Sequence, residues 1–369
     1  MYKVLVVGMS KNYGGIENVI FNYYKRFDRT QIHFDFCKSC KQKIAYEDIL
    51  KKWGSEIFYI PSKKNNMFLY RKYIINFFRT NSDHYDCIWV NRNDLANLDY
   101  IKLAKKYGIP RRIIHSHNVQ LLENSKIKTI MHKLNKERVY KYATDFWACS
   151  AAAADWFYPS KIRSKVVIVK NAIDILSFKY NDSIRKELRR KLKLENYCVI
   201  GHVGRLGYQK NQKFLIQVFS ELGKIKPNTK LVFLGDGNNK DELKELVKTL
   251  GLEDKVLFLG MKQKVQNWYN LFDVFVFPSR FEGLGIAALE AQANGLPCFV
   301  SKNNIPKDLK INKNFHFLSL DTTKLYWAKK IVDHMNEPRV SFRLIEKNFK
   351  LSGYSIDTAS KKLQSLFLG

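Results

Sequence analysis

The chain has 369 residues, 46% of them hydrophobic and 14% aromatic, and it carries a formal net charge of +30. This composition excludes an intrinsically disordered protein, and the length is enough for two domains with cores of their own. No apolar run approaches the ~20 residues of a membrane-spanning helix, and residues 1–8 predict a buried strand instead of a signal peptide. We therefore expect a cytoplasmic protein.

The positive charge comes from 64 basic and 34 acidic residues and is spread over both halves of the chain. Such a surface suits nucleic acid, anionic lipid or phosphorylated substrates, and a merely lysine-rich composition would look the same. The sequence contains no zinc-finger spacing, no RNA-binding aromatic motif and no basic zipper. We expect no nucleic-acid partner.

Short apolar runs alternate with helix-period segments along the whole chain, which predicts parallel sheets built from βαβ units. The pattern forms two series that meet near residues 171–179, so we expect two doubly wound α/β domains. Ligands of such sheets collect at the carboxyl ends of the strands, and the cleft between two facing domains is the default site. The expected strands are 4–8, 34–37, 57–60, 87–91, 112–115, 146–150 and 166–169, then 199–204, 230–235, 256–260, 274–278 and 297–301.

Two features of the first series are candidates for function. Gly14 and Gly15 follow the first strand and open a helix, a turn that suits a phosphate but that glycine pairs also form without a ligand. His115 and His117 end a later strand and point to the same face, so a metal site is imaginable. No third ligand lies near them in sequence, and a structural hydrogen bond is the simpler interpretation.

The cysteines do not predict a metal or redox centre, because four of the six lie in or beside apolar runs, where cysteine acts as a small hydrophobe. Cys37 and Cys40 have the two-residue spacing of a zinc or redox pair, but neither a second pair nor a histidine cluster accompanies them.

In the second series, Arg205 and Lys210 stand in a glycine-bearing loop directly after a strand. Cations at this edge are placed to neutralise a diphosphate, although a solvated basic loop has the same composition. A later strand runs through a turn containing Glu282, Gly283 and Gly285 into a helix. The free N–H groups of such a helix start suit a phosphate, and Glu290 lies two helical turns beyond Glu282 on the same side. A strand-loop-helix unit with two solvated acids is the alternative interpretation.

The whole of this last stretch closely resembles the signature of the retaining, nucleotide-sugar-dependent glycosyltransferases of family 4. The matching residues are Pro278-Ser279, Glu282-Gly283-Leu284-Gly285, Glu290-Ala291 and Gly295-Leu296-Pro297.

The resemblance implies the GT-B fold: two Rossmann-like domains facing across a cleft, with the C-terminal helix crossing back to the first domain. We expect the first domain to span 1–172 plus about 350–369, and the nucleotide-sugar-binding domain to span 173–349. Ala172 departs from the family, which usually has glycine there, and makes a positive φ less comfortable.

The resemblance also implies roles for single residues. Arg205 and Lys210 would clamp the donor diphosphate, Glu282 would contact sugar hydroxyls, and Glu290 would bind the ribose. His117, with His115 as the alternative, would lie beside the transferred sugar. The remaining implied contacts are the Gly14–Gly15 floor, the backbone at Met261 beside the base, and the amides of Gly283, Leu284 and Gly285 at phosphate or sugar oxygens.

These roles predict a hexosyltransferase that uses a UDP-linked sugar, with no cofactor and no metal. The chain has no Asp-x-Asp pair of the kind that holds a divalent ion in the other main glycosyltransferase fold. We expect the acceptor to be a lipid-linked saccharide in the assembly of a capsule, exopolysaccharide or lipopolysaccharide, and the enzyme to be peripheral on the inner face of the membrane.

A basic segment, 126–141, carries apolar residues at helical spacing, which fits either a helix on anionic lipid or an ordinary helix packed on the sheet.

Other functions remain open. A nucleotide-sugar epimerase or a glycosyl phosphorylase would share the architecture, but the Glu282–Gly285 motif argues against the first and the chain length against the second. A catalytically inactive basic module that binds membrane or nucleic acid is the alternative from another class, and the presence of Arg205, Lys210 and both glutamates argues against it.

Overall fold

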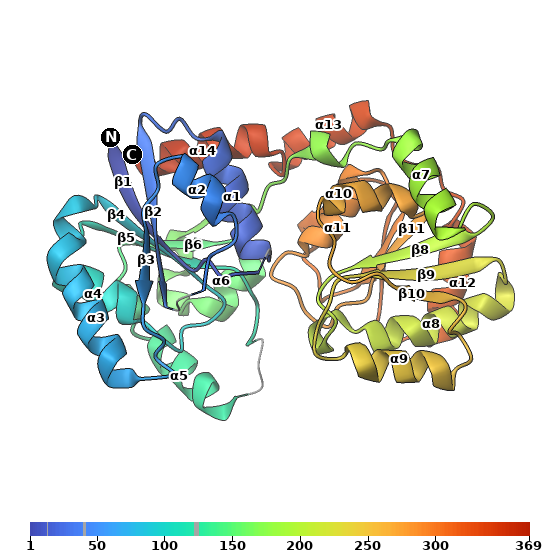
Figure 1. Cartoon of the computed structure of the whole chain (residues 1–369), viewed down its shortest axis with the longest axis horizontal. Coiled ribbons are helices and arrows are strands. Elements are labelled where there is room, and N and C mark those ends of the chain that lie inside the picture. Colours follow the sequence, from blue (N-terminus) through green and yellow to red (C-terminus); the bar gives the residue numbers. More distant parts are fainter. Residues whose placement is uncertain (13, 40–41, 122–124) are drawn as a thin grey trace. The chain divides into compact units, whose positions relative to one another are not determined.

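The structure is a computed structural model that describes residues 1–12, 14–39, 42–121 and 125–369. Cys40, half of the cysteine pair considered above, lies outside the described residues. Contacts divide the chain into two compact units, and the division falls after Ala172 and again after Ser355. The N-terminal unit comprises Met1–Ala172 with Ile356–Gly369, and the C-terminal unit comprises Ile173–Ser355 (Figure 1).

A parallel sheet of seven strands forms the centre of the N-terminal unit, in the order β3-β2-β1-β4-β5-β6-β7. The order reverses beside β1, the first strand, as it does in doubly wound folds, so β1 and β4 mark the switch point where ligands bind. The strands are β1 Tyr2–Val7, β2 Ile32–Ser39, β3 Ile57–Ile60, β4 Cys87–Arg92, β5 Arg111–Ser116, β6 Asp145–Ala148 and β7 Val166–Ile168.

Helices cover both faces of this sheet (Figure 1). Alternate residues of one strand serve the two faces: Ile88 and Val90 pack in the core with α3 and α4, whereas the Trp89 ring contacts Phe367 of the last helix, α14. The C-terminal helix therefore completes the core of the first unit. The helices are α1 Gly15–Arg26, α2 Glu47–Lys52, α3 Met67–Asn81, α4 Asp99–Lys106, α5 Lys126–Lys136, α6 Ala151–Phe157 and α14 Ile356–Leu368, with 3-10 turns η1 Ser82–His84, η2 Val139–Lys141 and η3 Ser160–Lys165.

The C-terminal unit repeats the plan with a six-stranded parallel sheet in the order β10-β9-β8-β11-β12-β13. Its first strand, β8, lies between β9 and β11, so the switch point falls beside β8 and β11. The strands are β8 Cys198–Val203, β9 Thr229–Leu234, β10 Val256–Phe258, β11 Val274–Phe277, β12 Cys298–Ser301 and β13 Phe315–Leu318.

Two layers of helices again enclose the sheet. Phe219 and Trp327 lie in the core on one face, and Leu289 and Phe349 lie in the core on the other. The helices are α7 Asp182–Leu192, α8 Gln212–Ile225, α9 Lys240–Thr249, α10 Val265–Trp268, α11 Ile286–Ala293, α12 Lys324–His334 and α13 Phe342–Ser352, with 3-10 turns η4 Ile175–Phe178, η5 Tyr208–Lys210, η6 Tyr269–Leu271 and η7 Lys307–Leu309.

The predicted fold class is confirmed: both units are Rossmann-like, and the last helix packs with the first unit. The sequence did not predict β13, a short edge strand of four residues with histidine at its second position. Edge strands of this length are easily missed, because a polar residue and turn-forming neighbours interrupt the apolar pattern. None of the helices in the described residues is long and apolar enough to cross a membrane.

Candidate functional site

Three loops of the C-terminal unit leave the sheet at its switch point. They follow β8, β9 and β11, which are neighbours in the sheet, and all three strands end at the same edge because the sheet is parallel. The loop after β8 carries Arg205 and Lys210, and the loop after β11 carries Glu282. Residues 72 positions apart in the sequence therefore meet at this edge.

Lys210 and Glu282 form an ion pair at the centre of this edge. The Lys210 Nζ atom lies 2.6 Å from Glu282 Oε1, and the two side chains are only 17% and 7% exposed. The same ammonium lies 4.7 Å from the centre of the Phe277 ring. A pair so shielded from water interacts more strongly than a surface pair, but removing either partner leaves a buried charge without compensation.

Arg205 occupies the opposite situation, because its side chain is exposed. Among the residues that the structure describes, its guanidinium forms no ion pair. Its backbone is nevertheless fixed, since the carbonyl oxygen accepts a hydrogen bond from Gln212 Nε2 at 2.9 Å. A free cation on an anchored backbone is suited to reach an incoming anion.

His202 and Gln212 anchor this loop, and neither was singled out from the sequence. The His202 Nδ1 lies 2.9 Å from the Val276 carbonyl oxygen, which requires a proton on Nδ1, and Nε2 accepts from the Gln212 amide at 3.1 Å. Burial lowers the pKa of His202 to about 4, so the ring is neutral, as this arrangement demands. Gln212 Oε1 accepts from the Gly207 N–H at 3.2 Å.

Glycine is required where the loops after β8 and β9 touch through their backbones. A Cβ on Gly235, where φ is +133°, would lie 2.1 Å from the Gly204 carbonyl oxygen. A Cβ on Gly237 would lie 2.1 Å from the Leu206 carbonyl oxygen. Any larger residue would force the loops apart and displace Arg205 with them.

Glu290 lies in α11, the helix that follows the loop of Glu282. It is buried in α11, and its Oε2 accepts a hydrogen bond from the Tyr269 hydroxyl at 2.6 Å. Burial raises the pKa of Glu290 to about 7, against the opposing effects of the Tyr269 hydrogen bond and the Lys210 charge. The carboxyl group is therefore poised between its two protonation states near neutral pH.

The turn into α11 brings the predicted amides to the same region. Gly285 caps the helix at φ +93°, a left-handed conformation that favours glycine, and Gly283 and Leu284 are buried before it. Met261 has a different setting: it is exposed in the loop after β10, the outer strand of the sheet. No described contact joins Met261 to Lys210 or Glu290.

The N-terminal unit has its own cluster at the ends of β1, β4 and β5. His117 follows β5, and its Nε2 lies 2.8 Å from Asn91 Oδ1 at the end of β4. Gly8 follows β1 at φ +125°, and a Cβ there would lie 2.5 Å from the Asn91 carbonyl oxygen. These three residues thus share the switch point of the first sheet.

His117 is neutral in this setting, because burial lowers its pKa to about 3. The His115 ring lies 4.1 Å away, centre to centre, and burial together with the neighbouring His117 lowers the pKa of His115 well below its ordinary range. Nδ1 of His117 has no hydrogen-bond partner among the described residues. The side chain offers one unused polar atom and no positive charge.

The glycine pair at the start of α1 is organised by Glu17. Glu17 Oε1 accepts the Ser10 N–H at 2.9 Å, and its Oε2 would lie 2.7 Å from a Cβ on Gly14. The carboxylate therefore already occupies part of the helix start, where an anion would otherwise be favoured. Gly15 is exposed.

Comparison with known proteins supports a glycosyltransferase. Residues 184–350, all within the C-terminal unit, match the model of the family described as Glycosyl transferases group 1. The chain is similar to the putative glycosyltransferase EpsF of Bacillus subtilis (strain 168), with 29% identity over 359 residues, which are 95% of this chain and 92% of that protein.

It is also similar to the UDP-Gal:alpha-D-GlcNAc-diphosphoundecaprenol alpha-1,3-galactosyltransferase of Escherichia coli, with 27% identity over 82% of this chain and 80% of that protein. Among solved structures, Anabaena Alr3699/HepE in complex with UDP and glucose has a TM-score of 0.81 at 17% identity, with full coverage of both chains. This likeness establishes the GT-B fold.

The buried carboxyl of Glu290 predicts a pH-dependent difference in stability. Its folded-state pKa of about 7 exceeds the ordinary 4.5, so ionisation opposes folding: the penalty is absent below pH 4.5, grows up to about pH 7 and is complete above it. Glu290→Gln should remove this penalty. The free energy of unfolding of the variant, relative to that of the wild type, should therefore increase by about 3 kcal/mol between pH 4.5 and pH 8. Urea unfolding across this range measures it.

The matched control is Glu346→Gln on α13, a half-buried glutamate paired with Lys350. Its unfolding free energy should run parallel to that of the wild type at every pH. Parallel curves for Glu290→Gln as well would contradict the buried, proton-binding carboxyl.

Proposed function

We propose that the chain is a metal-independent, retaining hexosyltransferase that takes its sugar from a UDP-linked donor. The observation that carries the proposal is the shielded Lys210–Glu282 pair beside the free Arg205 and the buried Glu290, all at the switch point of the C-terminal sheet. The match of this unit to the glycosyltransferase model and the UDP in a structural neighbour support it.

The proposed role of Lys210 is to exchange its internal partner for the donor diphosphate. Glu282 holds the lysine charge at 2.6 Å in the structure described above. A diphosphate brings more negative charge to the same ammonium, and it releases the carboxylate to accept hydrogen bonds from sugar hydroxyls. Arg205 then closes on the diphosphate from solvent, where a bidentate contact stabilises the charge that builds up on the leaving group.

Glu290 is proposed to bind the ribose. Tyr269 fixes one of its oxygens, so the other is left to face a hydroxyl pair. The amides of Gly283, Leu284 and Gly285 would hold phosphate or sugar oxygens at the start of α11. With two cations and a helix start available, the leaving group is stabilised without a divalent ion.

His117 is proposed to hydrogen-bond a hydroxyl of the substrate. Its neutral ring is oriented by Asn91, and Nδ1 is the atom left for this contact. Because Nε2 donates to the Asn91 amide oxygen, Nδ1 of the neutral ring carries a lone pair and accepts the hydrogen bond of a hydroxyl, which suits an uncharged sugar. Gly14 and Gly15 are proposed to shape the adjoining floor.

The acceptor is proposed to be a lipid-linked saccharide reached from the inner face of a membrane. Helix α5 supports a membrane contact, because its apolar side chains face solvent. The buried side of the helix carries two polar residues, His132 and Asn135. His132 accepts the Leu95 N–H at 3.1 Å, and Asn135 donates to the Leu95 carbonyl at 2.7 Å. The exposed stripe consists of Ile127, Ile130, Met131 and Leu134.

Lysines accompany this stripe at positions 126, 128, 133 and 136. Exposed apolar side chains with lysines on one helix are typical of a segment that lies in a membrane interface, where apolar burial and anionic lipids act together. The relative in Escherichia coli, which is named for a diphosphoundecaprenol substrate, also supports a lipid-linked acceptor.

Removing the free cation tests the proposed chemistry. Arg205→Ala should lower kcat/KM for transfer from the UDP-sugar by a factor of about 100 or more, because charge on the leaving diphosphate loses a stabilising contact of about 3 kcal/mol. The Tm should not change, since the side chain is exposed. Arg190→Ala on α7, another exposed arginine, is the control and should keep full activity. Equal activities would remove Arg205 from the site.

Vesicle sedimentation tests the proposed membrane contact. The double variant Ile127→Ser, Ile130→Ser should lose most of its binding to vesicles with anionic lipid, because two exposed apolar side chains no longer enter the interface. Leu351→Ser, which changes an exposed leucine of α13 in the other unit, should bind like the wild type. Unchanged binding of the double variant, or no binding by the wild type at low salt, would contradict the membrane role of α5.

A further inference from the structure

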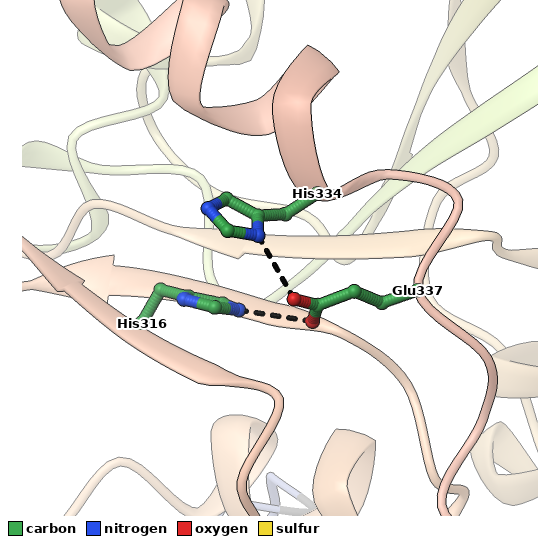
Figure 2. A group of neighbouring side chains, drawn as sticks. All are labelled: His316, His334 and Glu337. Carbon is green, nitrogen blue, oxygen red and sulfur yellow. Dashed lines mark hydrogen bonds and ion pairs between the residues drawn. The ribbon is translucent and has the colours of Figure 1, made fainter.

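Two histidines and a glutamate converge at the edge of the C-terminal sheet, in a group that the transfer chemistry does not use. His316 lies on the edge strand β13, His334 is the last residue of α12, and Glu337 follows three residues later. Figure 2 shows the three side chains pointing toward one another, with the carboxylate of Glu337 at the edge of the two rings and joined to each of them. All three are half-buried.

The distances define one compact group of donor atoms. His316 Nε2 lies 3.1 Å from Glu337 Oε2, and His334 Nδ1 lies 2.8 Å from Glu337 Oε1 (Figure 2). One ligand atom from each residue can be chosen so that all lie within 4.8 Å of one another. The three residues come from two separate elements, so the fold and not mere sequence proximity assembles them.

Packing also fixes the two rings. The His316 ring stacks on the Phe299 ring with centres 5.0 Å apart, and the His334 ring stacks on His316 at 4.5 Å. The Glu337 N–H donates to the His334 carbonyl at 3.0 Å, which closes the turn that brings the carboxylate back over the helix end. The donors are therefore held near one point before any ligand arrives.

We propose that His316, His334 and Glu337 form a binding site for a zinc-type transition-metal ion. Two imidazoles and one carboxylate are a ligand set that Zn²⁺ takes when a fourth position is left to water. Metal–ligand bonds of about 2.1 Å in a tetrahedron put the donor atoms about 3.4 Å apart. Modest side-chain rotation brings the three donors to that spacing, and partial exposure leaves the ion a path from solvent.

Metal binding replaces the two hydrogen bonds within the group. Both imidazoles must offer a lone pair, from Nε2 of His316 and Nδ1 of His334, so each neutral ring keeps its proton on the other nitrogen. Any proton on a doubly protonated ring is released to solvent.

The ion would act on the fold and not on the sugar transfer. The segment that follows Glu337 holds the end of α11: the Val340 N–H donates to the Gly295 carbonyl at 3.0 Å, and Arg339 donates to the carbonyl of Asn294 at 3.2 Å. A metal bridge between β13 and this segment would tighten the anchoring of the helix that carries Glu290. It would stabilise the C-terminal unit without supplying chemistry to it.

Calorimetric titration of the chelator-stripped full chain tests the site. Zn²⁺ should bind at pH 7.5 in a one-to-one step that His334→Gln and Glu337→Gln each weaken at least tenfold, and saturating Zn²⁺ should raise the Tm of the wild type by a few degrees. Mg²⁺, which prefers oxygen ligands, should give no such step. His33→Gln, which changes a histidine beside Asp35 in the other unit, is the matched control and should bind Zn²⁺ like the wild type.

Melting curves without metal establish that both variants fold, and His334 is the safer change because it is the more exposed of the two histidines. Absence of the one-to-one step in the wild type would overturn the proposal and leave the group as a hydrogen-bonded clasp. A step that persists at full affinity in both variants would also overturn it and assign the metal elsewhere. Neither result bears on the sugar transfer, which is expected to proceed in the presence of the chelator.

Discussion

The shielded ion pair between Lys210 and Glu282 is the interaction on which the proposed donor site depends. It joins two loops that are far apart in the sequence, and it holds the Lys210 ammonium where water has little access. A lone buried ammonium there would be unfavourable, and the Glu282 carboxylate compensates its charge. The same carboxylate becomes available as soon as a stronger anion takes its place. One pair thereby links the two loops in the structure and underlies the proposed preference for a diphosphate.

The residues around the pair fix the backbone of the loop that carries Arg205. Neutral His202 and the Gln212 amide fasten the loop of Arg205, and the close approach at Gly235 and Gly237 locks this loop to its neighbour. Desolvation then acts on Glu290, whose raised pKa reflects the same dry environment that strengthens the ion pair. Stability is therefore lowered at Glu290, one of the groups proposed to face the donor.

Much of the fold was predictable from the sequence, because the spacing of apolar residues indicates strands and helices and the glycine-bearing segments indicate turns. Apolar runs separated by helices predicted both sheets, and the glycines around Glu282 predicted the strand-turn-helix unit at the switch point. The pairing of Lys210 with Glu282 was not predictable, since it depends on which strands become neighbours. His202 lay inside an apolar strand, where nothing distinguished it from a core residue.

Two further features depended on three-dimensional context. The stripe of α5 had the spacing of a helix packed on a sheet, yet His132 and Asn135 take the buried positions through hydrogen bonds to Leu95. The His316–His334–Glu337 group joins an unpredicted edge strand to a helix end, so no local sequence motif predicts it. Sequence periodicity indicates which segments are regular, but not which of two faces is covered.

The most direct test of the donor site is thermal melting of the full chain with UDP, with uridine as the partner that lacks the diphosphate, each in chelator and in Mg²⁺. UDP at about 100 times its dissociation constant should stabilise the fold by about 2.7 kcal/mol, which raises the Tm by a few degrees. The account predicts this rise with UDP in chelator and Mg²⁺ alike, and a much smaller rise with uridine. Equal shifts for UDP and uridine, a shift that requires Mg²⁺, or no shift at all would contradict a metal-independent diphosphate site built around Lys210.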